Sequence, residues 1–210
     1  GEGKVYARSA EEQKRWHQTR LLRDDEKASL MNDAAISTIT FYTGTVDHLW
    51  LCARVRDIVR NNPVLGGRLV TGTAGPQVDF YEGGDDAEID YFELVEGSPA
   101  VAIAPKMPYD QLAAACRPYS VQKGIECLDK QADNLQGRLF RVTLFKQVED
   151  NCCALLVSMT HVLGDAHTFY RLYGMLDKKA EPIELSHSLS WERQSDFPAK
   201  KAQLFDSHAL

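Results

Sequence analysis

A nearly uninterrupted apolar run over residues 152–160 is the feature that most constrains the fold of this chain. Strands that are covered on both faces read as continuous hydrophobic runs, so this run predicts a central β-strand. Apolar residues return to helical spacing over residues 169–178, which predicts an amphipathic helix soon after the strand. The loop between them contains His161, Gly164 and Asp165.

A second strand precedes the central one. Residues 139–145 alternate between apolar side chains and the polar pair Arg141 and Thr143, which predicts a half-buried strand. Residues 147–151 are the expected polar turn between the two strands.

Further elements follow from the same two periodicities. Expected strands cover residues 36–42, 64–70, 78–81 and 89–95, and expected helices cover residues 11–20, 24–31, 46–62 and 109–116. Residues 119–136 have no pattern that supports an assignment. The expected fold is therefore α/β, with a mixed, mostly antiparallel sheet flanked by helices.

The charge and hydropathy of the sequence argue against nucleic-acid binding and against a membrane span. The 24 basic and 30 acidic residues give a net charge of -6 without a basic cluster, so nucleic acid is not an expected partner. No window approaches the roughly 20 apolar residues of a membrane span, and residues 1–4 begin without an apolar signal core. A soluble protein is expected.

Five cysteines, an odd number without CxxC spacing, argue against structural zinc and against a disulfide framework. The adjacent pair Cys152 and Cys153 would point to opposite faces of a strand, where a bond between them would be strained. We expect reduced thiols, no metal, and a reducing compartment, either the cytoplasm or an organelle interior.

His161 is the residue best placed for chemistry. It is expected at the exit of a buried strand, and Asp165 follows four residues later, across a turn that Gly164 can make at low steric cost. An imidazole oriented by a third group can activate a hydroxyl, amine or thiol. The alternative is a histidine buried at a strand end and satisfied by backbone groups.

Three stretches together resemble the chloramphenicol acetyltransferase-like superfamily, which includes the BAHD acyltransferases and the condensation domains of peptide synthetases. They are the His161-x-x-x-Asp165 motif, the preceding strand from Gly137 to Thr143, and an early block formed by Asn62, Pro63, Val64, Leu65, Arg68 and Leu69. The fuller family motif is HHxxxDG, and here Thr160 stands at the first histidine and Ala166 at the final glycine.

This resemblance implies a function and a role for each matched residue. His161 would be the general base of an acyltransferase that moves an acyl group from a thioester of the acyl-CoA type to a hydroxyl or amine. Asp165 would hold the loop through an ion pair with an arginine, for which Arg68 and Arg15 are the candidates. Gly164 supports the turn, no cofactor is tightly bound, and the acyl thioester and a small-molecule acceptor are the co-substrates.

The resemblance covers only the N-terminal half of the two-domain members. Residues 1–179 are the expected acyltransferase-like domain, and residues 180–210 an extended arm with scattered apolar side chains. We expect this arm to lie at least partly on a partner: a second acyltransferase half, an identical subunit or another protein. The alternative function is a catalytically silent half-domain that serves as a structural or docking subunit of a larger assembly.

Overall fold

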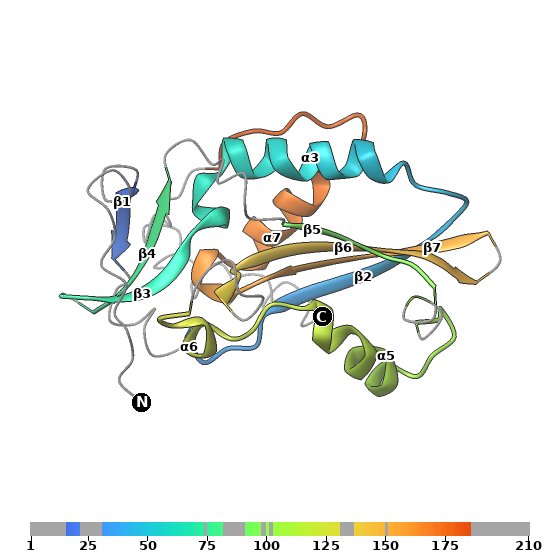
Figure 1. Ribbon diagram of the computed structural model, residues 1–210, viewed down its shortest axis with the longest axis horizontal. Coiled ribbons are helices and arrows are strands. Elements are labelled where there is room, and N and C mark those ends of the chain that lie inside the picture. The colour runs from blue at the N-terminus through green and yellow to red at the C-terminus, as the bar shows by residue number, and fades with distance from the viewer. Residues whose placement is uncertain are drawn as a thin grey trace, which may run out of the picture.

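The computed structural model describes residues 16–21, 31–73, 75–81, 91–97, 100, 103–130, 137–149 and 151–185 (Figure 1). The described strands are β1 (Trp16–Leu21), β2 (Ile36–Thr43), β3 (Arg68–Gly72), β4 (Gly75–Tyr81), β5 (Phe92–Val95), β6 (Phe140–Glu149) and β7 (Cys152–Met159). The α-helices are α3 (His48–Asn61), α5 (Tyr109–Cys116), α6 (Gly124–Cys127) and α7 (Ala166–Gly174). Short 3-10 helices cover Pro63–Gly66, Arg117–Tyr119 and His161–Leu163.

The strands form two sheets. The larger has the order β2-β7-β6-β5, with β7 antiparallel to both neighbours and β5 parallel to β6. The smaller, β1-β4-β3, is antiparallel and lies at one end of the molecule (Figure 1). The expected mixed, mostly antiparallel sheet with flanking helices is confirmed.

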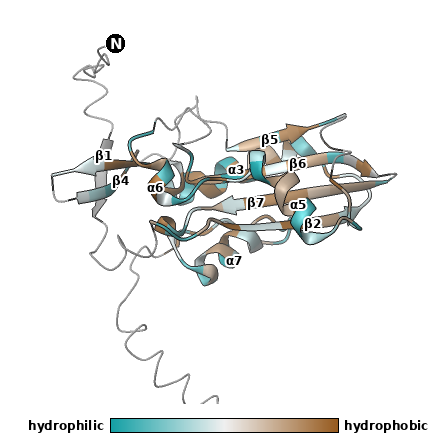
Figure 2. Cartoon of the chain, turned by 90° about the horizontal axis from the view of Figure 1, so that it is seen from below, coloured by the Kyte–Doolittle hydropathy of each residue, from teal (hydrophilic) through white to brown (hydrophobic). Residues whose placement is uncertain are grey.

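The larger sheet has a hydrophobic core on each face. Side chains of α3 and α7 pack on one face, and α5 packs on the other, where Phe145, Ala154 and Leu156 lie with Cys116. Figure 2 shows hydrophobic residues along β5, β6 and β7 and on α5. Every residue of β7 after Cys152 is buried, as the apolar run predicts.

The partner strand β6 differs from its prediction because its polar face is also covered. Arg141 is only 3% exposed and Thr143 is fully buried. The Arg141 guanidinium forms an ion pair with Glu93, donates to the Pro118 carbonyl at 3.0 Å, and lies over the Tyr119 ring. The strand also continues to Glu149, through most of the expected turn.

Helix α3 forms where its apolar spacing predicts it. Asp47 caps its start by accepting hydrogen bonds from the backbone N–H groups of Leu49 and Trp50. Its buried residues are Leu51, Val55, Ile58 and Val59. The helix ends at Asn61, before the Pro63 that cannot continue it.

Two predictions near the smaller sheet are wrong. Residues 16–20 were expected at the end of a helix but form strand β1 on the edge of β4, where pairing overrides helix propensity. Residues 64–66 were expected in a strand but belong to a 3-10 helix that starts at Pro63, so β3 begins only at Arg68. Residues 11–15 and 22–30 lie outside the described residues.

The remaining boundaries differ from the predictions by a few residues. Helix α5 and the β3–β4 hairpin form as predicted. Strand β5 begins at Phe92, and its expected first residues, 89–90, are not described. Helix α7 occupies Ala166–Gly174 rather than residues 169–178. The unassigned stretch contains helix α6.

The expected arm begins as part of the domain. Residues 180–185 run along α3 (Figure 1): Arg54 donates to the Ala180 carbonyl at 2.8 Å, Asn62 binds the backbone of Ile183 and Leu185, and Leu185 is buried. The expected boundary between residues 179 and 180 therefore does not separate the arm from the domain. Residues 186–210 lie outside the described residues, and their contact with a partner stays a prediction.

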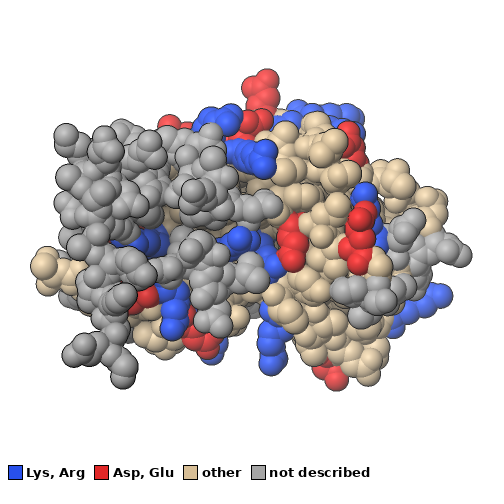
Figure 3. All heavy atoms as spheres, in the orientation of Figure 1, with Lys and Arg blue, Asp and Glu red and all other residues tan. Residues whose placement is uncertain are grey.

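The five cysteines are free thiols, as predicted. In the part of the chain that is described, no helix has the length and apolar content to cross a bilayer. Basic and acidic side chains are interspersed on the face seen in Figure 3, without a large field of one sign.

Candidate functional site

His161 lies at the exit of the central strand, as the sequence predicts. Strand β7 ends at Met159, and the Thr160 N–H continues the pairing by donating to the Leu139 carbonyl at 2.9 Å. His161 then opens a 3-10 turn whose next two residues, Val162 and Leu163, are buried. These buried neighbours hold the backbone of His161 in place, while its own side chain stays half-buried.

No carboxylate among the described residues binds the imidazole of His161. Its Nδ1 atom is buried without a hydrogen-bond partner among the described residues, and so is Oγ1 of the neighbouring Thr160. Buried polar atoms are normally satisfied by protein or water. Because Nδ1 is buried while the side chain as a whole is only half-buried, Nε2 is the ring nitrogen on the accessible side.

Asp165 has a different role from the one expected. Its exposed carboxylate caps α7, accepting a hydrogen bond from the Thr168 N–H at 2.8 Å. Burial works to raise the pKa of Asp165, but hydrogen bonds from the backbone and hydroxyl of Thr168, together with His167, outweigh it and lower the pKa. Asp165 thus sets the start of the helix, and it makes no ion pair with a described arginine.

Of the two arginines proposed for Asp165, the structure describes only Arg68, which pairs elsewhere. The Arg68 Nη2 atom lies 4.0 Å from an Asp79 carboxylate oxygen, so this arginine serves the β3–β4 hairpin. Arg15 lies outside the described residues. The sequence analysis instead missed the ion pair between buried Arg141 and partly exposed Glu93, which joins β6 to β5. An arginine inside an otherwise apolar strand was the available signal.

Replacing Asp165 tests this capping role. Asp165→Ala should lower the free energy of unfolding by about 1 kcal/mol, whereas Asp165→Asn should keep most of the stability because asparagine caps equally well. Since the pKa of Asp165 is lowered in the folded state, the deficit of Asp165→Ala should be complete above the ordinary aspartate pKa of about 3.9 and shrink as the pH falls below it. Urea denaturation at several pH values measures both effects. An Asp165→Asn protein as unstable as Asp165→Ala would contradict the cap.

Gly164 is needed for space rather than for an unusual turn. Its φ of 166° is extended backbone that any residue adopts, so the expected conformational reason is wrong. A Cβ at this position would lie 2.7 Å from both Cβ and Cγ2 of Thr168. The glycine therefore lets the first turn of α7 pack against the loop that carries His161.

Adding one methyl group at Gly164 should strain this contact. We expect Gly164→Ala to cost about 1–2 kcal/mol of folding stability, the scale of overpacking. Gly174→Ala is the matched control, because a Cβ there meets no atom within 4 Å. Thermal unfolding of both variants measures the difference, and equal melting temperatures would show that the loop absorbs the methyl group freely.

The described residues around His161 were compared with two kinds of site, a metal centre and a pocket. Among the described residues, no three His, Cys, Asp or Glu side chains gather as a metal site. Two of the pockets that described residues form have volumes of about 380 and 500 Å³, and His161 lines neither of these two. Among the described residues, His161 therefore presents its imidazole at the end of the central strand β7 of the larger sheet.

Comparison with known proteins relates this geometry to one fold. No protein-family model matches the chain, and no curated protein matches it. Among solved structures, the starter condensation domain of rhizomide synthetase RzmA aligns with a TM-score of 0.53 and 16% identity, over 89% of this chain and 46% of that one. The chain has a condensation-domain-like fold. The likeness is one of fold alone, because the sequence identity is low.

A second solved structure has the same relation to the chain. Polyketide synthase associated protein 5 from Mycobacterium tuberculosis aligns with a TM-score of 0.50 and 14% identity, over 75% of this chain and 31% of that one. The chain thus spans less than half the length of both structures. The condensation-domain-like fold described here corresponds to one part of each.

Proposed function

We propose that this chain is an acyltransferase half-domain, which acts when a second half or another subunit faces His161. The reaction is acyl transfer from a thioester, of the acyl-CoA type or similar, to a hydroxyl or amine, as in the HxxxD acyltransferases, including the BAHD type. The observation that carries the proposal is the position of His161, presented at the end of the central strand of a condensation-domain-like fold.

The proposed step needs one base and no metal. The acceptor oxygen or nitrogen attacks the thioester carbonyl carbon while Nε2 of His161 takes its proton. The tetrahedral intermediate then collapses, the carbon–sulfur bond breaks, and the thiolate leaves and receives the proton from the imidazolium. Asp165 caps α7, and no described carboxylate orients the His161 ring.

The second proposal is a catalytically silent half-domain that docks in a larger assembly. It is favoured by two observations on the described residues: no carboxylate among them binds His161, and His161 does not line the 380 Å³ or the 500 Å³ pocket. Both proposals place the protein in a reducing compartment, which suits its five free thiols.

One experiment separates the two proposals. The full chain is incubated with acyl-CoA thioesters and a set of amines and alcohols, and acylated acceptor is detected by mass spectrometry, because the protein's own thiols would disturb a thiol-release assay. The native mass is measured on the same sample. If acylated acceptor forms only in the fractions that contain the oligomer, the acyltransferase proposal is supported. An assembly that transfers no acyl group under any of these conditions supports the docking subunit.

A further inference from the structure

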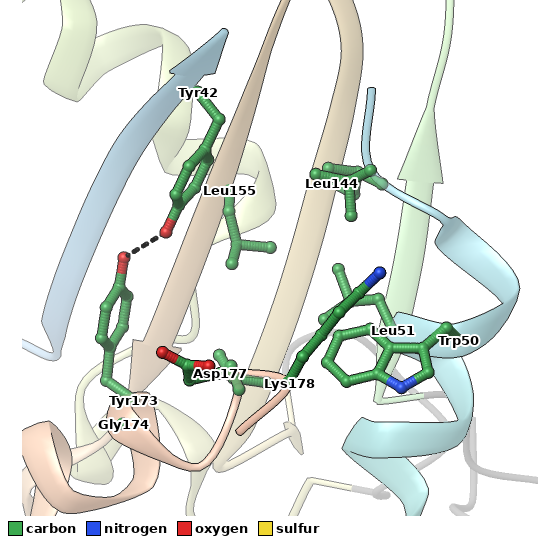
Figure 4. Close-up of a pocket in the computed structure, with 11 residues that line it drawn as sticks. Tyr42, Trp50, Leu51, Leu144, Leu155, Tyr173, Gly174, Asp177 and Lys178 are labelled. Atoms are coloured by element: carbon green, nitrogen blue, oxygen red, sulfur yellow. Dashed lines mark hydrogen bonds between the residues drawn. The ribbon is translucent and has the colours of Figure 1, made fainter. Parts of the chain in front are cut away.

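A pocket of about 380 Å³ lies on the α3 and α7 side of the larger sheet, away from His161 (Figure 4). Its floor and walls are apolar, formed by the leucines Leu51, Leu144, Leu155 and Leu176. Leu155 lies in β7, six residues before His161, which follows the end of that strand, so the two are at most roughly 20 Å apart along the chain. The pocket is therefore a separate site from the one proposed for catalysis.

One side of the pocket carries a chain of hydroxyl groups. The Thr40 hydroxyl lies 2.6 Å from the Tyr173 hydroxyl, which lies 3.1 Å from that of Tyr42. Three hydroxyls carry three protons and the two bonds use two, so one proton remains to be donated. Burial, followed by the bond to Tyr173, raises the pKa of Tyr42 to about 12, so this phenol stays neutral and keeps its proton at physiological pH.

The opposite side is aromatic and cationic. Figure 4 shows Lys178 beside the Trp50 ring, across the pocket from the two tyrosines, with its Nζ 5.2 Å from the ring centroid. Lys178 makes no ion pair with a described residue. The Asp177 carboxylate, which also lines the pocket, is engaged in its own turn, accepting a hydrogen bond from the Lys179 N–H.

Apolar walls with a hydroxyl donor and an ammonium group suit one class of ligand. We propose that this pocket binds a small apolar monocarboxylate, such as a medium-chain fatty acid, with its chain on the leucines and its carboxylate on Lys178. The volume is at the small end of the range for ligand pockets, about 300–1,000 Å³, which limits the chain length. This proposal is independent of acyl transfer and stands whether or not His161 is catalytic.

Octanoate is the probe, and 1-octanol and octylammonium are its matched neutral and cationic forms. Calorimetric titration of the full chain should show octanoate binding at least about tenfold more tightly than either, because only the carboxylate forms a charge-assisted bond with Lys178. Lys178→Gln should weaken octanoate about tenfold and leave 1-octanol unchanged. Lys179→Gln, the adjacent lysine outside the pocket lining, is the control and should change neither.

A steric variant tests the location independently. Gly174 lines the pocket, and a Cβ there meets no atom within 4 Å, so Gly174→Leu can occupy space without displacing the backbone. It should abolish binding of octanoate and 1-octanol while the melting temperature stays at the wild-type value. The proposal is overturned if wild-type protein binds no octanoate, if Lys178→Gln and Lys179→Gln behave alike, or if Gly174→Leu binds normally. Equal affinity for octanoate and 1-octanol would show that the pocket recognises only the apolar chain, which also overturns the proposal.

Discussion

His161→Ala should lower kcat for acyl transfer by ~100-fold or more, the usual scale for the loss of a general base. The reason is that Nε2 of His161 is the proton acceptor of the proposed step, and no other described histidine stands at a strand exit beside it. Turnover is measured on the active assembly as acylated acceptor formed per minute. The fold should survive, because the side chain is only half-buried and makes no Nδ1 hydrogen bond among the described residues.

His167→Ala is the matched control. His167 is exposed on the first turn of α7, in the same loop-to-helix segment, and has no place in the proposed chemistry. It should keep wild-type turnover within a few-fold. A well-folded His161→Ala protein that acylates its acceptor as fast as His167→Ala would remove the enzymatic proposal and leave the docking subunit.

Asn62→Leu should be the most destabilising single change considered, at about 3 kcal/mol. Asn62 is fully buried, and its amide donates to the carbonyls of Ile58 and Ile183 at 3.0 Å and accepts from the Leu185 N–H at 2.8 Å. Leucine is similar in size, but it leaves the Ile183 carbonyl and the Leu185 N–H without hydrogen-bond partners. A buried polar group without a partner lowers the free energy of unfolding. For a domain of this size the melting temperature should fall by about 6–12 °C.

Asn61→Leu provides the comparison, because the same substitution is made one residue earlier. Asn61 is exposed and makes a single bond to the Asp57 carbonyl within its own helix. Its replacement should stay within about 0.5 kcal/mol of wild type. If both variants have the same melting temperature, residues 183–185 contribute nothing to the stability of the domain. Limited proteolysis should then cut this segment in the wild-type protein as well.

The sequence alone determined the elements whose burial follows from local pattern. Strand β7 is apolar on both faces because both faces are covered, and α3 shows its buried side at helical spacing. Helix α5 and the β3–β4 hairpin could likewise be predicted from the residues within each segment. His161 could be placed because its position depends only on where β7 ends.

Interactions between residues far apart in the chain were beyond the reach of such patterns. Strand β1 forms because β4 offers it an edge, which its own helix-forming composition does not reveal. The alternation of apolar and polar residues placed Arg141 on the solvent side of β6. In the structure its guanidinium binds the Pro118 carbonyl and the Glu93 carboxylate. Tyr42 and Tyr173, 131 residues apart, meet only when α7 packs on the sheet.

The site itself shows the same division between local and tertiary causes. The His-x-x-x-Asp motif stays a prediction, but the contact that the Asp165 side chain makes could be learned only from the fold. Asp165 immediately precedes α7, whose first N–H groups lack intrahelical partners, and it caps that helix. Sequence therefore determined which residues reach the strand exit. The tertiary structure decided their partners, because hydrogen bonds and ion pairs depend on distances that a linear pattern does not contain.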